Sequence, residues 1–132
     1  MLRVLIVDDH AIFRAGLKQV ISDEPDMRVT GEAGTAREAI DLARLPDSWD
    51  VVVLDIAMPG KNGLDALKQI RLINPRLPVL ILSMYPEDQY AIRVLRAGAA
   101  GYLSKEGAPD ELVGAIRKVA RGGRYEIGRA HV

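Results

Sequence analysis

Three aspartates, a serine and a lysine stand at or just after the ends of short apolar runs in this sequence. They are Asp8, Asp9, Asp55, Ser83 and Lys105. If those runs are parallel strands of one sheet, their carboxyl ends lie at the same edge, and these side chains converge in one crevice. Carboxylates that close together raise one another's pKa or require a counterion. Mg²⁺ is a natural counterion, because it prefers one or two carboxylates together with waters and phosphate oxygens.

This set of groups is what phosphoryl transfer to a carboxylate needs. One aspartate acts as the nucleophile, and Mg²⁺ bridges it to the phosphate oxygens. The Lys105 ammonium adds positive charge against the phosphoryl oxygens, and the Ser83 hydroxyl donates a hydrogen bond. Each residue alone also has a simpler interpretation, as a solvated turn or cap residue, a strand terminator or a surface lysine. Their coincidence at four strand ends favours a functional site.

The apolar runs alternate with segments of helical period. Residues 2–7, 51–54 and 79–82 are short and almost continuously apolar, as strands buried on both faces are, and 27–33 and 101–103 are weaker candidates. Strict alternation predicts parallel strands, right-handed crossovers and helices on both faces of one sheet. The predicted fold class is therefore α/β, a flavodoxin-like, doubly wound, five-stranded parallel sheet in the order 2-1-3-4-5.

Length and composition exclude several classes of protein. The chain has 132 residues, with 18 lysines and arginines against 18 aspartates and glutamates, and it contains no cysteine. The length fits one domain, and the lack of cysteine excludes zinc–thiolate sites, thiol nucleophiles and disulfide scaffolds. Balanced charge argues against direct nucleic-acid binding by this domain. No uncharged apolar run approaches the roughly 20 residues of a membrane span, so the expected location is the cytoplasm.

The segment around Asp55 resembles the receiver domain of two-component response regulators, whose fold is CheY-like. The resemblance is carried by the string Asp55-Ile56-Ala57-Met58-Pro59-Gly60, with Gly63 three residues further on, together with the acids, the serine and the lysine named above. Residues 97–105 look like the NarL/FixJ (LuxR-type) subfamily. The resemblance covers nearly the whole chain, to about residue 122.

The resemblance implies a role for each acid. Asp55 would be the phosphoacceptor, taking a phosphoryl group from the phosphohistidine of a sensor histidine kinase. Asp9 would ligate Mg²⁺ directly and Asp8 directly or through water, with Asp55 and the main-chain carbonyl of Ala57 completing the protein ligands. The chain is then not an enzyme in the usual sense, since it catalyses at most its own phosphorylation and dephosphorylation.

The resemblance also implies a switch. Ser83 and Lys105 would bind the phosphoryl group, and Tyr102 would turn inward once Ser83 has moved. The movement would remodel the face made by the fourth helix, the fifth strand and the fifth helix, which the family uses for homodimerisation or for release of an output domain. The charged residues expected on this face are Arg93, Arg96, Glu111, Arg117 and Lys118.

The domain boundaries follow from the same reading. Residues 1–121 are predicted to form the receiver domain and 122–132 a linker stub or tail, because two glycines open that segment and no periodic pattern follows. Members of the subfamily carry a C-terminal DNA-binding helix-turn-helix domain, which is absent from this chain. Transcription regulation would therefore act through that missing part.

Two other functions are alternatives to a receiver domain that is switched by phosphorylation. A Mg²⁺-dependent phosphohydrolase would need a second acid two residues after its nucleophile, and Ala57 stands there. An interaction module that works without phosphorylation is compatible with the sequence, although all the acids that phosphorylation needs are intact.

Overall fold

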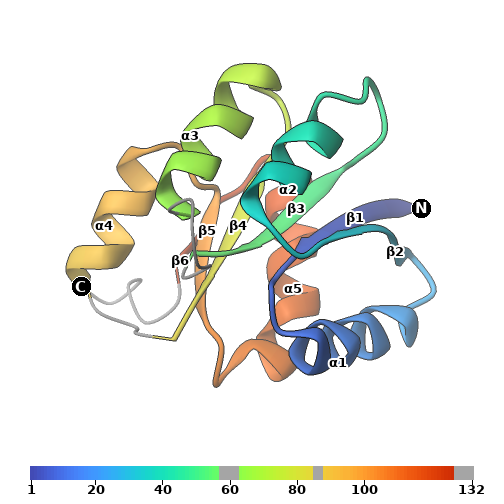
Figure 1. Ribbon diagram of the computed structural model, residues 1–132. Helices are drawn as coiled ribbons and strands as arrows, with labels where there is room; N and C mark the ends of the chain where they lie inside the picture. The colour runs from blue at the N-terminus through green and yellow to red at the C-terminus, as the bar shows by residue number, and fades with distance from the viewer. Residues whose placement is uncertain (57–62, 85–87, 127–132) are drawn as a thin grey trace.

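Strands and helices alternate along the chain as the sequence predicts (Figure 1). The computed structural model describes residues 1–56, 63–84 and 88–126. The elements are β1 (Leu2–Val7), α1 (Ala11–Ser22), β2 (Met27–Ala33), α2 (Ala36–Ala43), β3 (Val51–Asp55), α3 (Gly63–Ile73), β4 (Val79–Ser83), α4 (Asp88–Arg96), β5 (Gly101–Ser104), α5 (Ala108–Ala120) and β6 (Tyr125–Glu126).

All strands form one parallel sheet in the order β2-β1-β3-β4-β5-β6. The predicted order of the first five strands is confirmed. The winding direction of the chain reverses between β1 and β3, which lie side by side with Val7 opposite Leu54. This is the position at which sheets of this class open a crevice at the carboxyl ends of their strands.

The helices cover both faces of the sheet and create two hydrophobic cores (Figure 1). Successive strand residues point to opposite faces, so Leu5 and Val7 pack under α2, α3 and α4, whereas Val4 and Ile6 pack under α1 and α5. All four of these β1 side chains are fully buried. Among the described helices, none combines the length and apolar character that crossing a bilayer requires.

The segment after α5 contains a short strand that the sequence does not indicate. Tyr125 and Glu126, within the predicted linker stub or tail at 122–132, form a sixth strand beside β5. A two-residue strand has too few positions to show an alternating pattern, so the sequence carries no periodic signal for it.

Two charges expected on a dimer face are paired within the chain. Arg117 reaches the α1–β2 connection, where its Nε donates to Asp26 at 2.9 Å and its Nη2 to Glu24 at 2.7 Å. Glu111 accepts a hydrogen bond from the Tyr125 hydroxyl at 2.8 Å. Helical periodicity predicts that the Arg117 and Glu111 side chains point away from the core, but it does not predict which neighbouring segment each side chain contacts.

An ion pair joins the starts of β1 and β3 and predicts a pH dependence. Asp50 Oδ2 accepts from Arg3 N at 2.7 Å and from Arg3 Nε at 3.0 Å, and these bonds lower the pKa of Asp50. A lowered carboxyl pKa stabilises the fold above the unfolded-state pKa, and this contribution is lost as the pH falls through the folded-state value. We expect wild type to exceed Asp50→Asn by about 1 kcal/mol in unfolding free energy at neutral pH. Urea unfolding should show the difference shrinking below about pH 4, and a difference independent of pH would contradict this role.

Candidate functional site

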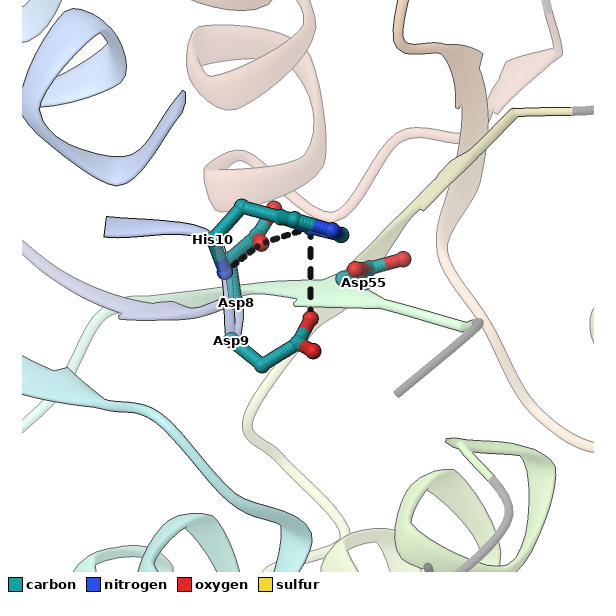
Figure 2. Close-up of side chains that lie close together, drawn as sticks. All are labelled: Asp8, Asp9, His10 and Asp55. Carbon is teal, nitrogen blue, oxygen red and sulfur yellow. Dashed lines mark hydrogen bonds and ion pairs between the residues drawn. The ribbon is translucent and has the colours of Figure 1, made fainter. Parts of the chain in front are cut away.

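The acids converge where β1 and β3 end. Asp8 follows β1 directly and Asp55 is the last residue of β3, and both are fully buried. Figure 2 shows these two carboxylates beside Asp9 and His10. One ligand atom from each of the four residues lies within 4.8 Å of the others. The neighbouring positions of β1 and β3 in the sheet, predicted from strand order, produce this cluster.

Lys105 provides the positive charge of the cluster. Its Nζ lies 2.9 Å from Asp8 Oδ2 and 3.1 Å from Asp55 Oδ2, and the residue is only 8% exposed. Burial alone would lower the pKa of Lys105, but hydrogen bonds and charge from Asp8 and Asp55 outweigh it and raise the pKa above its ordinary value. The Nζ also lies 4.6 Å from the centre of the Phe13 ring, a cation–π contact. Lys105 therefore stays charged and bridges the two buried acids.

The carboxylates keep acceptor capacity for a further cation. Asp8 Oδ1 accepts a hydrogen bond from the His10 amide at 2.8 Å. Asp8 Oδ2 and Asp9 Oδ1 are shielded from solvent, and the contacts given for them are ion pairs, with Lys105 Nζ at 2.9 Å and His10 Nδ1 at 3.3 Å respectively. Buried carboxylate oxygens with unused lone pairs are costly unless a cation neutralises them. Asp8 and Asp9 have such oxygens, and together with the neighbouring Asp55 they fit a hard divalent cation, which prefers oxygen ligands.

His10 belongs to the cluster, although the predicted metal ligands did not include it. It is the N-cap residue of α1, and its side chain is 62% exposed. Its Nδ1 lies 3.2 Å from Asp8 Oδ1, 3.3 Å from Asp9 Oδ1 and 3.5 Å from Lys105 Nζ. The only feature of the sequence that indicated a place for His10 in the cluster was its position directly after two aspartates. The ring forms one wall of the acidic site on its solvent side.

Ser83 and Tyr102 lie on the strands next to the acids. Ser83 ends β4 and is fully buried, and its carbonyl accepts from the Lys105 amide at 2.8 Å. Tyr102 lies on β5, three residues before Lys105, and is 2% exposed in the core under α2, α3 and α4. The Tyr102 side chain, predicted to turn inward once Ser83 has moved, is therefore already buried. The sheet therefore brings the predicted residues Asp8, Asp9, Asp55, Ser83 and Lys105 to the carboxyl ends of its strands, while Ala57 lies outside the described residues.

A cleft of about 580 Å³ opens beside the acids. It is lined by His10, Ile12, Phe13, Asp55, Met84, Lys105 and Glu106. Ile12 at the start of α1 is 91% exposed and Met84 is 57% exposed, so the rim is apolar around a charged floor. The sequence does not indicate Ile12 or Met84 as part of the site, because a single apolar residue at a helix start or after a strand carries no distinctive pattern.

The comparisons with known proteins agree with this geometry. The response regulator receiver domain family matches residues 4–117. The chain therefore belongs to the response regulator receiver family, a class of signalling domains, and the resemblance seen around Asp55 is confirmed. Its function as a phosphorylation-activated signalling switch is confirmed at the level of this class.

Relatives and solved structures support the subfamily and the fold. The response regulator UvrY of Escherichia coli (strain K12) is 41% identical over 125 residues, which are 95% of this chain and 57% of UvrY. The response regulator GacA of Pseudomonas aeruginosa is 38% identical over 125 residues, 95% of this chain and 58% of GacA. The chain thus spans a little over half the length of these relatives. A crystal structure of a two-component response regulator of the LuxR family from Aurantimonas sp. SI85-9A1 has a TM-score of 0.89 at 37% identity and covers 95% of this chain and 89% of that one.

Proposed function

We propose that Asp55 is the phosphoacceptor of this receiver domain. The observation that carries the proposal is the buried Asp55 carboxylate held 3.1 Å from the Lys105 ammonium within the acidic cluster. A carboxylate is a competent nucleophile toward a phosphoryl group, and a fixed ammonium stabilises the charge on the transferring oxygens. Because Asp55 also borders the cleft, a donor can approach it from there.

The bound cation would be Mg²⁺, held by Asp8, Asp9 and Asp55, with the main-chain carbonyl of Ala57 as a further ligand. Bound there, Mg²⁺ would neutralise charge on the phosphoryl oxygens. The protein's own groups would do the rest. Ser83 would donate a hydrogen bond to the aspartyl phosphate, Lys105 would pair with it, and Tyr102, which is already buried, would form part of the switch.

The donor would be the phosphohistidine of a sensor histidine kinase, and the apolar rim around the cleft offers a surface for that contact. Residues 1–121 would form the receiver domain of a cytoplasmic transcriptional regulator. A C-terminal domain outside this chain would bind DNA. Phosphorylation would control that domain or homodimerisation through the face formed by α4, β5 and α5, called the α4–β5–α5 face below.

The test is to incubate the chain with acetyl phosphate and Mg²⁺ and to measure its intact mass. The expected result is the addition of one phosphoryl group with Mg²⁺ and none with a chelator, because the acids need the cation to accept another anion. A chain that gains no mass would overturn the proposal. Continuous release of phosphate from a phosphate ester would instead favour a phosphohydrolase.

A further inference from the structure

The outer edge of β5 is occupied by the chain's own strand β6. Gly101 and Tyr102 lie opposite Tyr125 and Glu126 in parallel register, and the Tyr125 amide donates to the Ala100 carbonyl at 2.9 Å. Figure 1 shows β6 at the β5 end of the sheet. An edge strand presents N–H and C=O groups that a further strand or a partner chain can pair with. Here the first part of β5 has that partner already.

The cap of α5 directs the chain back onto β5. Gly122 has a φ of +90°, which favours glycine. Its amide donates to the Val119 carbonyl, and the Gly123 amide donates to the Lys118 carbonyl, both at 3.0 Å. These two bonds form a Schellman motif, with glycine at the left-handed position. The path toward β6 is therefore set by the helix cap.

Tyr125 anchors the strand. Its hydroxyl donates to Glu111 Oε1 on the first turn of α5 at 2.8 Å, and its side chain packs against the core under α1 and α5. Burial, followed by the bond to Glu111, raises the pKa of Tyr125 to about 12, so the hydroxyl remains a donor at neutral pH. A Cβ on Gly101 would lie 2.6 Å from the Tyr125 carbonyl oxygen, and glycine at this position permits the close approach.

We propose that β6 is an intramolecular strap that competes with a second copy of this chain for the β5 edge. The inference rests on the α4–β5–α5 dimer face of the proposed function, because the strap lies within that face. Docking of β6 also engages Glu111, the acid on α5 whose charge is opposite to that of Arg93 and Arg96 on α4. Undocking frees both the edge and this carboxylate for reciprocal pairing across a twofold axis.

The competition has a simple thermodynamic form. If only the undocked chain dimerises, the apparent affinity between copies is reduced by the fraction of chains that are undocked. The Tyr125 hydrogen bond to a carboxylate is charge-assisted and belongs to the stronger class. Removing this hydrogen bond and the Tyr125 ring should therefore lower the apparent dimer dissociation constant by about tenfold or more.

The experiment compares the full chain with Tyr125→Ala, Tyr125→Phe and Leu72→Ala by sedimentation velocity over a range of concentrations. Leu72 is an 82% exposed apolar residue of α3 and controls for the loss of a large side chain elsewhere. Hydrogen exchange at the β5 amides reports whether the strap has undocked. The expected order of self-association is Tyr125→Ala strongest, Tyr125→Phe intermediate, and Leu72→Ala equal to wild type. Adding Glu111→Gln to Tyr125→Ala should remove much of the gain.

The outcomes separate this inference from the proposed phosphorylation. If Tyr125→Ala exposes β5 to exchange but associates no more than wild type, the strap does not compete and the inference is wrong. Weaker association of Tyr125→Ala would make β6 part of the interface, which also overturns it, as would the absence of association in every variant. The measurement uses unphosphorylated protein, so a failure of Asp55 to accept phosphate leaves its result intact.

Discussion

Replacing Asp55 by asparagine is expected to reduce phosphoryl labelling by acetyl phosphate to less than about 1% of the wild-type level. The side-chain amide has nearly the same shape but is a poor nucleophile, and it removes one of the acids that face the cation. Asp8 keeps its ion pair with Lys105 at 2.9 Å, so the variant should retain its fold. Intact-mass measurement with Mg²⁺ present checks the labelling, and circular dichroism checks the fold.

Asp41→Asn is the matched control for this loss. Asp41 lies on α2, where its carboxylate is 63% exposed beside Arg37, and the substitution makes the same chemical change away from the acidic cluster. It should label as wild type does. Equal labelling of Asp55→Asn would show that another residue accepts the phosphoryl group, and the assignment of Asp55 would then be wrong.

The strand order was predictable because burial leaves a strong mark on the sequence. Residues 51–54 of β3 are apolar without interruption, since both faces of this strand are covered by helices. The glycine cap at Gly122 and the two-residue strand β6 leave no comparable pattern of apolar residues in the sequence. The path from Gly122 to Tyr125 depends on a left-handed turn and on one hydrogen bond to Glu111, which only the folded chain brings together.

The site was predictable to the level of strand ends. Topology alone requires that residues following β1 and β3 be neighbours, and Asp8 and Asp55 are. The sequence could not show that Lys105 bridges the two acids above the Phe13 ring, because a lysine's reach depends on rotamers and loop path. The same limit applies to His10. Its place directly after Asp9 was evident from the sequence, but the orientation of its ring depends on the side-chain rotamer and could not be predicted.

Substituting Lys105 by methionine is expected to lower the unfolding free energy by about 3 kcal/mol when no divalent cation is present. The substitution keeps the apolar stem but leaves Asp8 and Asp55, both fully buried, without their shared cation. Lys18→Met is the control, because Lys18 pairs with Glu32 at a site where its side chain is 45% exposed. That variant should lose less than about 1 kcal/mol in the same urea-unfolding experiment.

Mg²⁺ should reverse more of this loss in Lys105→Met than it adds to wild type. The Lys105 ammonium lies 2.9 Å from Asp8 Oδ2, a buried oxygen of a proposed Mg²⁺ ligand. Lysine and cation therefore compete for the same negative charge, and removing the lysine should tighten Mg²⁺ binding by about tenfold. A cation that binds only the folded state stabilises it by RT ln(1 + [L]/Kd), so saturating Mg²⁺ should add about 1.4 kcal/mol more to the variant than to wild type. Urea unfolding across a series of Mg²⁺ concentrations measures the gain in unfolding free energy of each protein. Equal gains in wild type and Lys105→Met would show that Lys105 does not compete with the cation.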